Sequence, residues 1–153
     1  MRAGILAAAA LMLALASPAF AVARVYKGHY PTGTAVYSVS DGRIYKGHYA
    51  SGTAVYSFKG GRLYAGHYAS GTALFAFDGG RLYKGHYASG TAVFSYDGSR
   101  IYKGHYASGT AIFTLDAVRL YAGHYATGTA RFSFDGKDEI PPGVLVFLAT
   151  QVL

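Results

Sequence analysis

Six histidines recur every 19 residues, and they are the side chains of this sequence best suited to chemistry. Imidazoles bind metals, carry protons and respond to pH. The six positions are therefore weak candidate metal ligands or a pH-responsive element, whereas the alternative is an aromatic ring that packs on tyrosine and bonds the backbone. The absence of cysteine excludes thiolate ligands and a cysteine nucleophile. The six are His29, His48, His67, His86, His105 and His124.

Lysines and tyrosines follow the same period and are the candidate ligand-binding residues. Strand alternation places the lysines on the face of the histidines, where their charge disfavours a bound cation. If that face lines a narrow ring, repulsion opposes histidine protonation, and stability should fall below about pH 6.5. Tyrosine rings could stack on glycans or form the core. The candidates are Tyr26, Tyr45, Tyr64, Tyr83, Tyr102 and Tyr121, with Lys27, Lys46, Lys84 and Lys103.

No group of residues in the sequence resembles a catalytic site. The acidic residues lie mostly in turns, where aspartate usually bonds its own backbone. They also neighbour the arginines that open each repeat, so we expect Asp–Arg pairs. No serine stands in a G-x-S-x-G motif, and no glycine-rich loop leads into a helix. The sequence therefore predicts a protein that is not an enzyme, with no cofactor.

The elements that position these side chains are six tandem repeats. They begin at residues 24, 43, 62, 81, 100 and 119 and cover 24–137. Each repeat holds two glycine-bearing turns and two runs of about six β-forming residues, which predicts about twelve short antiparallel strands. Gly47 and its equivalents fall inside a predicted strand, which indicates a bend or a close backbone approach. The segment 116–118 lacks the turn glycine, so we expect that loop to differ.

An all-β ring follows, in which the first and sixth repeats meet and leave no open sheet edge. A twelve-stranded barrel would be roughly 24 Å wide, too wide for six-residue strands to fill. We therefore expect one strand from each repeat to form a ring about 12 Å wide, with the others projecting as hairpins. Strands of this length are also too short for a membrane-spanning barrel.

Both ends of the chain depart from the repeat. Residues 1–21 have the charge, apolar run and Ala-Phe-Ala ending of a signal peptide cleaved after Ala21, which predicts a secreted or periplasmic protein. The repeat domain then covers 22–137. The apolar segment 138–153 is too short to span a membrane, so the mature chain has no transmembrane span. We expect it to cap one mouth of the ring; the alternative is a membrane-surface or partner-docking segment.

The repeat resembles the β-flower families of bacterial tandem-hairpin proteins. The resemblance is carried by Tyr45-Lys46-Gly47, Tyr102-Lys103-Gly104, the Ser/Thr-Gly-Thr-Ala turn and the closing Asp-Gly, and it covers 24–137. It implies a shallow barrel with radially arranged hairpin petals, and it implies no activity. MORN repeats and choline-binding hairpins are less similar, because both usually carry a tryptophan that is missing here.

The sequence thus predicts a non-enzymatic exported repeat protein with a binding or structural role at the bacterial cell envelope. The alternative function is a carbohydrate- or peptidoglycan-binding hairpin array that uses exposed tyrosines. A formal charge of +7 makes an anionic envelope component a candidate partner, beside a glycan or an apolar small molecule. Nucleic acid is not an expected partner of an exported protein.

Overall fold

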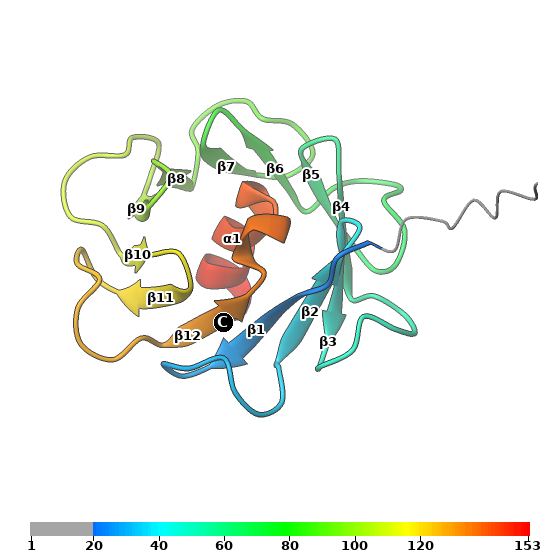
Figure 1. Ribbon diagram of the computed structural model, residues 1–153. Helices are drawn as coiled ribbons and strands as arrows, with labels where there is room; N and C mark the ends of the chain where they lie inside the picture. The colour runs from blue at the N-terminus through cyan, green and yellow to red at the C-terminus, as the bar shows by residue number, and fades with distance from the viewer. Residues whose placement is uncertain (1–19) are drawn as a thin grey trace, which may run out of the picture.

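The computed structural model describes residues 20–153, which form a closed barrel of twelve antiparallel strands around a central helix (Figure 1). Each strand pairs with the next, and β1 pairs with β12, so the first and sixth repeats meet as predicted. Most of the predicted signal peptide, residues 1–19, lies outside the described part. The strands are β1 (Ala23–Lys27), β2 (Tyr37–Ser40), β3 (Arg43–Lys46), β4 (Tyr56–Lys59), β5 (Arg62–Ala65), β6 (Phe75–Asp78), β7 (Arg81–Lys84), β8 (Phe94–Tyr96), β9 (Arg100–Lys103), β10 (Phe113–Leu115), β11 (Arg119–Ala122) and β12 (Phe132–Asp135).

The expectation that only one strand per repeat forms the ring is wrong, because all twelve strands lie in the barrel wall. A wall of twelve strands leaves a centre that side chains of short strands cannot fill. The segment after the last repeat fills it. A 3₁₀ turn (Lys137–Glu139) leads into α1 (Pro142–Phe147), which continues as a π-helical stretch (Leu148–Val152). A helix about 10–12 Å across fits inside a wall roughly 24 Å wide.

The tail buries its apolar residues as expected, but inside the barrel and not over one mouth. Val144 and Val146 are fully buried, and Leu148 is 1% exposed. They share one core with the inward side chains of the first strand of each repeat, which are Val25, Ile44, Leu63, Leu82, Ile101 and Leu120. A helix that is apolar on all sides is stable only when it is buried, and the barrel supplies that environment.

The hairpin turns explain the glycines at the strand ends. Asp41 and Gly42 both have positive φ (48° and 70°), as a two-residue turn between twisted strands requires. The turn that lacks glycine differs from the Asp41-Gly42 turn, because the Asp116 side chain accepts hydrogen bonds from the N–H groups of Val118 and Arg119. The turn at Asp97 contains Gly98 and has the same bonds, so the missing glycine does not explain this form. Among the described residues, no helix is long and apolar enough to cross a membrane.

Candidate functional site

The six histidines join neighbouring repeats. Each Nδ1 accepts a hydrogen bond of 2.9–3.1 Å from the backbone N–H of a buried alanine in the preceding repeat, as His86 does from Ala73. The bond from Ala130 to His29 closes the circle. An acceptor nitrogen must carry a lone pair, so this bond requires an Nδ1 without a hydrogen. This bond to the backbone is the one that the alternative interpretation of the histidines expects.

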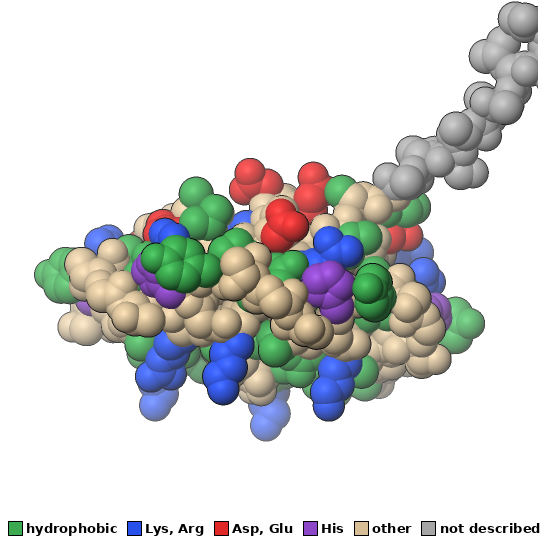
Figure 2. Space-filling model, turned by 60° about the horizontal axis from the view of Figure 1, so that its bottom comes forward, with side chains coloured by type: hydrophobic (Ala, Val, Ile, Leu, Met, Phe, Trp, Pro, Cys, Tyr) green, Lys and Arg blue, Asp and Glu red, His purple; other side chains and the backbone are tan. Residues whose placement is uncertain are grey.

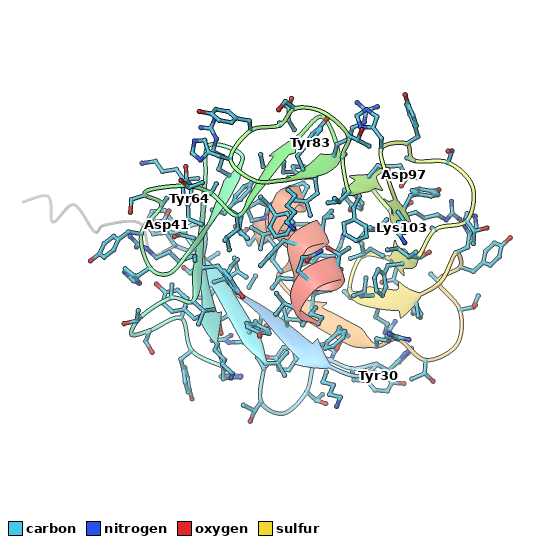
Figure 3. All side chains as sticks on the ribbon, turned by 180° about the vertical axis from the view of Figure 1, so that it is seen from behind. Tyr30, Asp41, Tyr64, Tyr83, Asp97 and Lys103 are labelled. Atoms are coloured by element: carbon cyan, nitrogen blue, oxygen red, sulfur yellow. The ribbon has the colours of Figure 1, made fainter. Side chains whose placement is uncertain are left out.

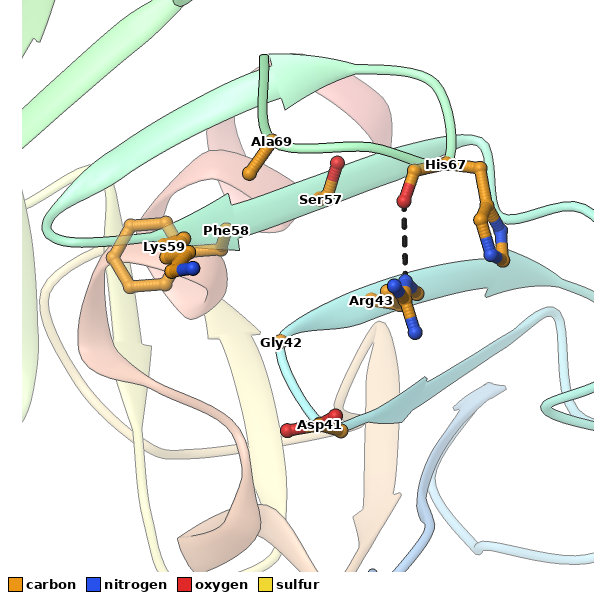
Figure 4. Close-up of a pocket in the computed structure, with 8 residues that line it drawn as sticks. All are labelled: Asp41, Gly42, Arg43, Ser57, Phe58, Lys59, His67 and Ala69. Carbon is orange, nitrogen blue, oxygen red and sulfur yellow. Dashed lines mark hydrogen bonds between the residues drawn. The ribbon is translucent and has the colours of Figure 1, made fainter.

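The arginines that open the repeats strengthen the same junctions. Each Nε donates to the carbonyl of the histidine 24 residues ahead, as Arg43 does to His67 at 3.1 Å (Figure 4), and Arg119 donates to His29. At Nε–H, each arginine therefore bonds a histidine carbonyl and not the neighbouring aspartate that the sequence led us to expect. Side chain and backbone of one histidine are therefore both held by the preceding repeat.

The predicted sharing of one face by lysine and histidine is also wrong. β3 ends at Lys46, and Gly47 takes a φ of 97°, which reverses the chain and breaks the alternation. No atom lies within 4 Å of the place of a Gly47 Cβ, so the glycine serves the bend and not a close approach. His48 consequently lies in the outer loop, and the narrow histidine ring behind the predicted pH effect does not form. Within residues 20–153, no three His, Asp or Glu side chains gather as a metal site.

The tyrosines predicted to bind ligand are buried. Tyr26, Tyr45, Tyr64, Tyr83, Tyr102 and Tyr121 are only 5–8% exposed. They lie on the outer face of the wall beneath the loops, and each packs edge-on against the histidine of the following repeat at 6.2–6.4 Å. Both faces of the wall are therefore covered, one by the helix and the other by the loops.

A second set of tyrosines, one in each repeat and four residues after the buried one, is exposed; we call it the second tyrosine register. Its members are 63–70% exposed, and Figure 3 shows Tyr30 at the periphery. Strand alternation alone would place both tyrosine registers on one face, and the glycine bend separates them. The six are Tyr30, Tyr49, Tyr68, Tyr87, Tyr106 and Tyr125.

These exposed rings are held in place by their neighbours. Each stands edge-on to the preceding histidine, with ring centroids 4.8–5.0 Å apart. In three repeats an arginine guanidinium also lies over the ring, as Arg62 lies 5.8 Å from the centroid of Tyr87. Contacts of each kind contribute about 0.5–1.5 kcal/mol. The loops between the two strands of each repeat, which we call the petals, thus hold six exposed tyrosines in ordered positions.

The four candidate lysines are exposed, as a ligand-binding role requires. Lys27, Lys46, Lys84 and Lys103 end the strands β1, β3, β7 and β9 at one edge of the barrel. The buried tyrosines point to the outer face of the same strands, so the structure does not bring the two predicted sets together. The lysines and the second tyrosine register are separate surfaces.

A polar depression of about 320 Å³ lies between the second and third repeats (Figure 4). Asp41, Arg43, Lys59 and His67 line it. The Nδ1 of His67 already accepts the Ala54 N–H, and Arg43 already donates to the His67 carbonyl. Two of its four ionisable side chains are therefore engaged in the repeat junction.

Asp97 organises the turn between β8 and β9. Its Oδ1 accepts hydrogen bonds from the N–H groups of Ser99 and Arg100 at 3.0 and 2.7 Å. Burial alone would raise the pKa of this carboxyl, but the hydrogen bonds from Ser99, Arg100 and Tyr102 together outweigh it, so the pKa lies below its ordinary value. Burial and the nearby carboxylate raise the pKa of Tyr96.

The protein is a six-fold repeat structure. Six β-hairpins form a closed barrel around a helix, and each repeat carries one exposed tyrosine on the outside. The family model described as "6-fold beta flower protein" matches residues 25–145. The chain belongs to this family, which confirms the resemblance of its repeats. Neither a curated protein nor a solved structure matches the chain.

Proposed function

We propose that the protein is an exported, non-enzymatic scaffold with a binding or structural role at the bacterial cell envelope. One observation carries the proposal: the repeated polar side chains are used to join the repeats to one another. In the fourth repeat, the His86 ring, the Arg81 Nε–H and the Ser95 hydroxyl all bond backbone groups. The barrel centre is filled by the helix, which favours a scaffold over a carrier of an apolar molecule.

A second candidate function is the binding of carbohydrate or peptidoglycan, and the exposed tyrosines favour it. Tyrosine is enriched at binding surfaces, because its ring is large, rigid and amphipathic. Six exposed tyrosines around the barrel could each contact one unit of a repetitive polymer, and these weak contacts would add through multivalency. The residues that carry this function are the second tyrosine register and not the buried first one.

Retention on purified peptidoglycan and envelope polysaccharide separates the two. A variant with Tyr68, Tyr87 and Tyr106 changed to serine removes half of the exposed rings. The matched control changes the exposed Thr72, Thr91 and Thr110 of the same petals to alanine. Retention that falls in the tyrosine variant alone supports glycan binding. No retention of the wild-type protein on either polymer excludes it and leaves the scaffold role.

Export is tested by expressing the full chain in a bacterial host and fractionating the cells. The proposal expects the protein in the periplasm or medium, with a mass that corresponds to a chain starting at Val22. Uncleaved protein that stays in the cytoplasm would contradict it.

A further inference from the structure

One mouth of the barrel carries an unusual arrangement of positive charge. The exposed residue that ends the first strand of each repeat is lysine in four repeats and alanine in two, Ala65 and Ala122. The lysines therefore form two neighbouring pairs, Lys27 with Lys46 and Lys84 with Lys103, separated by the alanines. The exposed Arg131 precedes β12 at the same edge.

Every carboxylate side chain of the protein lies at the other edge. The acidic residues end the second strand of a repeat, lie in the turn after it, or follow β12. Figure 2 shows the acidic side chains at the top of the view, with some basic ones among them, and only basic charged side chains at the bottom. The chain also ends here, because Leu153 lies beside Lys27 and Lys46, so its terminal carboxylate offsets one of these charges. The charged side chains of this end are all basic, which orients it toward an anionic surface. The acidic residues are Asp41, Asp78, Asp97, Asp116, Asp135, Asp138 and Glu139.

Each lysine pair flanks an apolar depression beside the end of the central helix. The first, of about 460 Å³, lies between Lys27 and Lys46 over Tyr37, Phe132 and Leu153. The second, of about 440 Å³, lies between Lys84 and Lys103 and is lined by side chains that include Phe75, Val93 and Phe94. Between the lysine pairs, Val55 and Leu74 are 36% and 39% exposed. The surface of this mouth therefore consists of lysine side chains with apolar surface between them.

We propose that this mouth docks on a membrane surface rich in anionic phospholipid. The lysine ammonium groups would meet the lipid phosphates, and the apolar depressions and side chains would enter the boundary between headgroups and acyl chains. Apolar surface between paired lysines fits an amphiphile better than a fully hydrated polyanion such as nucleic acid or an acidic glycan. The inference takes its biological setting from the proposed envelope location, but it does not involve the tyrosines.

Binding of the full chain to vesicles tests the proposal. Vesicles of phosphatidylcholine with and without phosphatidylglycerol are sedimented at about 0.1 M salt, where the Debye length is about 10 Å. The variant Lys27→Gln/Lys46→Gln should bind the anionic vesicles roughly 30-fold more weakly, given a factor of roughly five per lysine. The matched control Lys59→Gln/Lys137→Gln removes the same charge from the acidic edge and should bind as the wild type does. An equal loss in both variants would overturn the proposal.

The two alanine positions allow a gain of function. Ala65→Lys/Ala122→Lys completes the ring at exposed sites and should strengthen binding roughly 30-fold. No gain, equal binding to neutral vesicles, or tighter binding to duplex DNA or an acidic polysaccharide would each overturn membrane docking. Thermal melts confirm that every variant folds. The test of membrane docking is independent of the test of glycan binding, because the serine variant of Tyr68, Tyr87 and Tyr106 should bind vesicles as the wild type does.

Discussion

Replacing one histidine should loosen the barrel at a single junction. In His86→Ala, the backbone N–H of Ala73 loses its acceptor, the Nδ1 that lies 2.9 Å away. Ala73 is only 3% exposed, so water cannot easily replace the ring nitrogen. The ring also loses its edge-on contacts with Tyr64 at 6.3 Å and Tyr87 at 4.9 Å.

The expected cost follows from these contacts. An unsatisfied buried donor costs about 1–3 kcal/mol, and each aromatic contact contributes about 0.5–1.5 kcal/mol. With allowance for relaxation, His86→Ala should lower the free energy of unfolding by about 3 kcal/mol. For a domain of this size, that corresponds to a fall in Tm of roughly 10 °C.

His86→Asn is the informative control. Its side-chain oxygen can occupy the place of Nδ1 and accept the Ala73 N–H, while the aromatic contacts are lost. We expect about half the loss of the alanine variant in urea-unfolding midpoints and thermal melts. Tyr87→Ser, which changes the exposed neighbour, should cost least. If asparagine destabilises as much as alanine, the hydrogen bond to Nδ1 does not contribute and the reasoning is refuted.

Three further substitutions test the core and one turn. Leu148→Ala should cost about 2–5 kcal/mol in chemical unfolding, whereas the exposed Gln151→Ala on the same helix should change little. Gly143→Ala places a Cβ 2.9 Å from the Phe77 Cβ, so it should cost about 1–3 kcal/mol in spite of the better helix propensity of alanine; wild-type stability would contradict this packing. Because hydrogen bonds hold the pKa of Asp97 below its ordinary value, its charge stabilises the fold above about pH 4, and this contribution is lost as the pH falls further. Asp97→Asn should therefore be less stable than the wild type at pH 7 and nearly equal near pH 2, and a gap that does not change with pH would show that the charge is unimportant.

The repeat period made much of the fold predictable. The arginine interval predicts the six hairpins, the turn glycines predict the strand ends, and the need to leave no open sheet edge predicts the closure of β1 on β12. The sequence argument rejected a twelve-stranded barrel as too wide for short strands to fill, but the helix that fills it comes from outside the repeat. A signal for that helix was present, because residues 140–149 carry no charge and a helix apolar on all sides must be buried.

The exposed and buried tyrosines could not be separated from the sequence. Alternation holds only while a strand continues, and β3 ends at Lys46, three residues before Tyr49, to which the pattern extends it. The positive φ of Gly47 then turned His48 outward to the preceding repeat and left Tyr49 70% exposed. A glycine permits such a bend without requiring it, so the sequence alone did not decide between Tyr45 and Tyr49 as the accessible ring.

NMR contacts between the first and last strands show whether the ring is closed. β1 and β12 are more than a hundred residues apart in the sequence, yet Val25 lies opposite Phe134 and Tyr26 opposite Ser133. The closed barrel predicts nuclear Overhauser contacts between backbone protons of residues 24–27 and 132–135, together with slow amide exchange in both strands. Contacts of β1 with β2 alone, and rapid exchange of the free edges of β1 and β12, would contradict it.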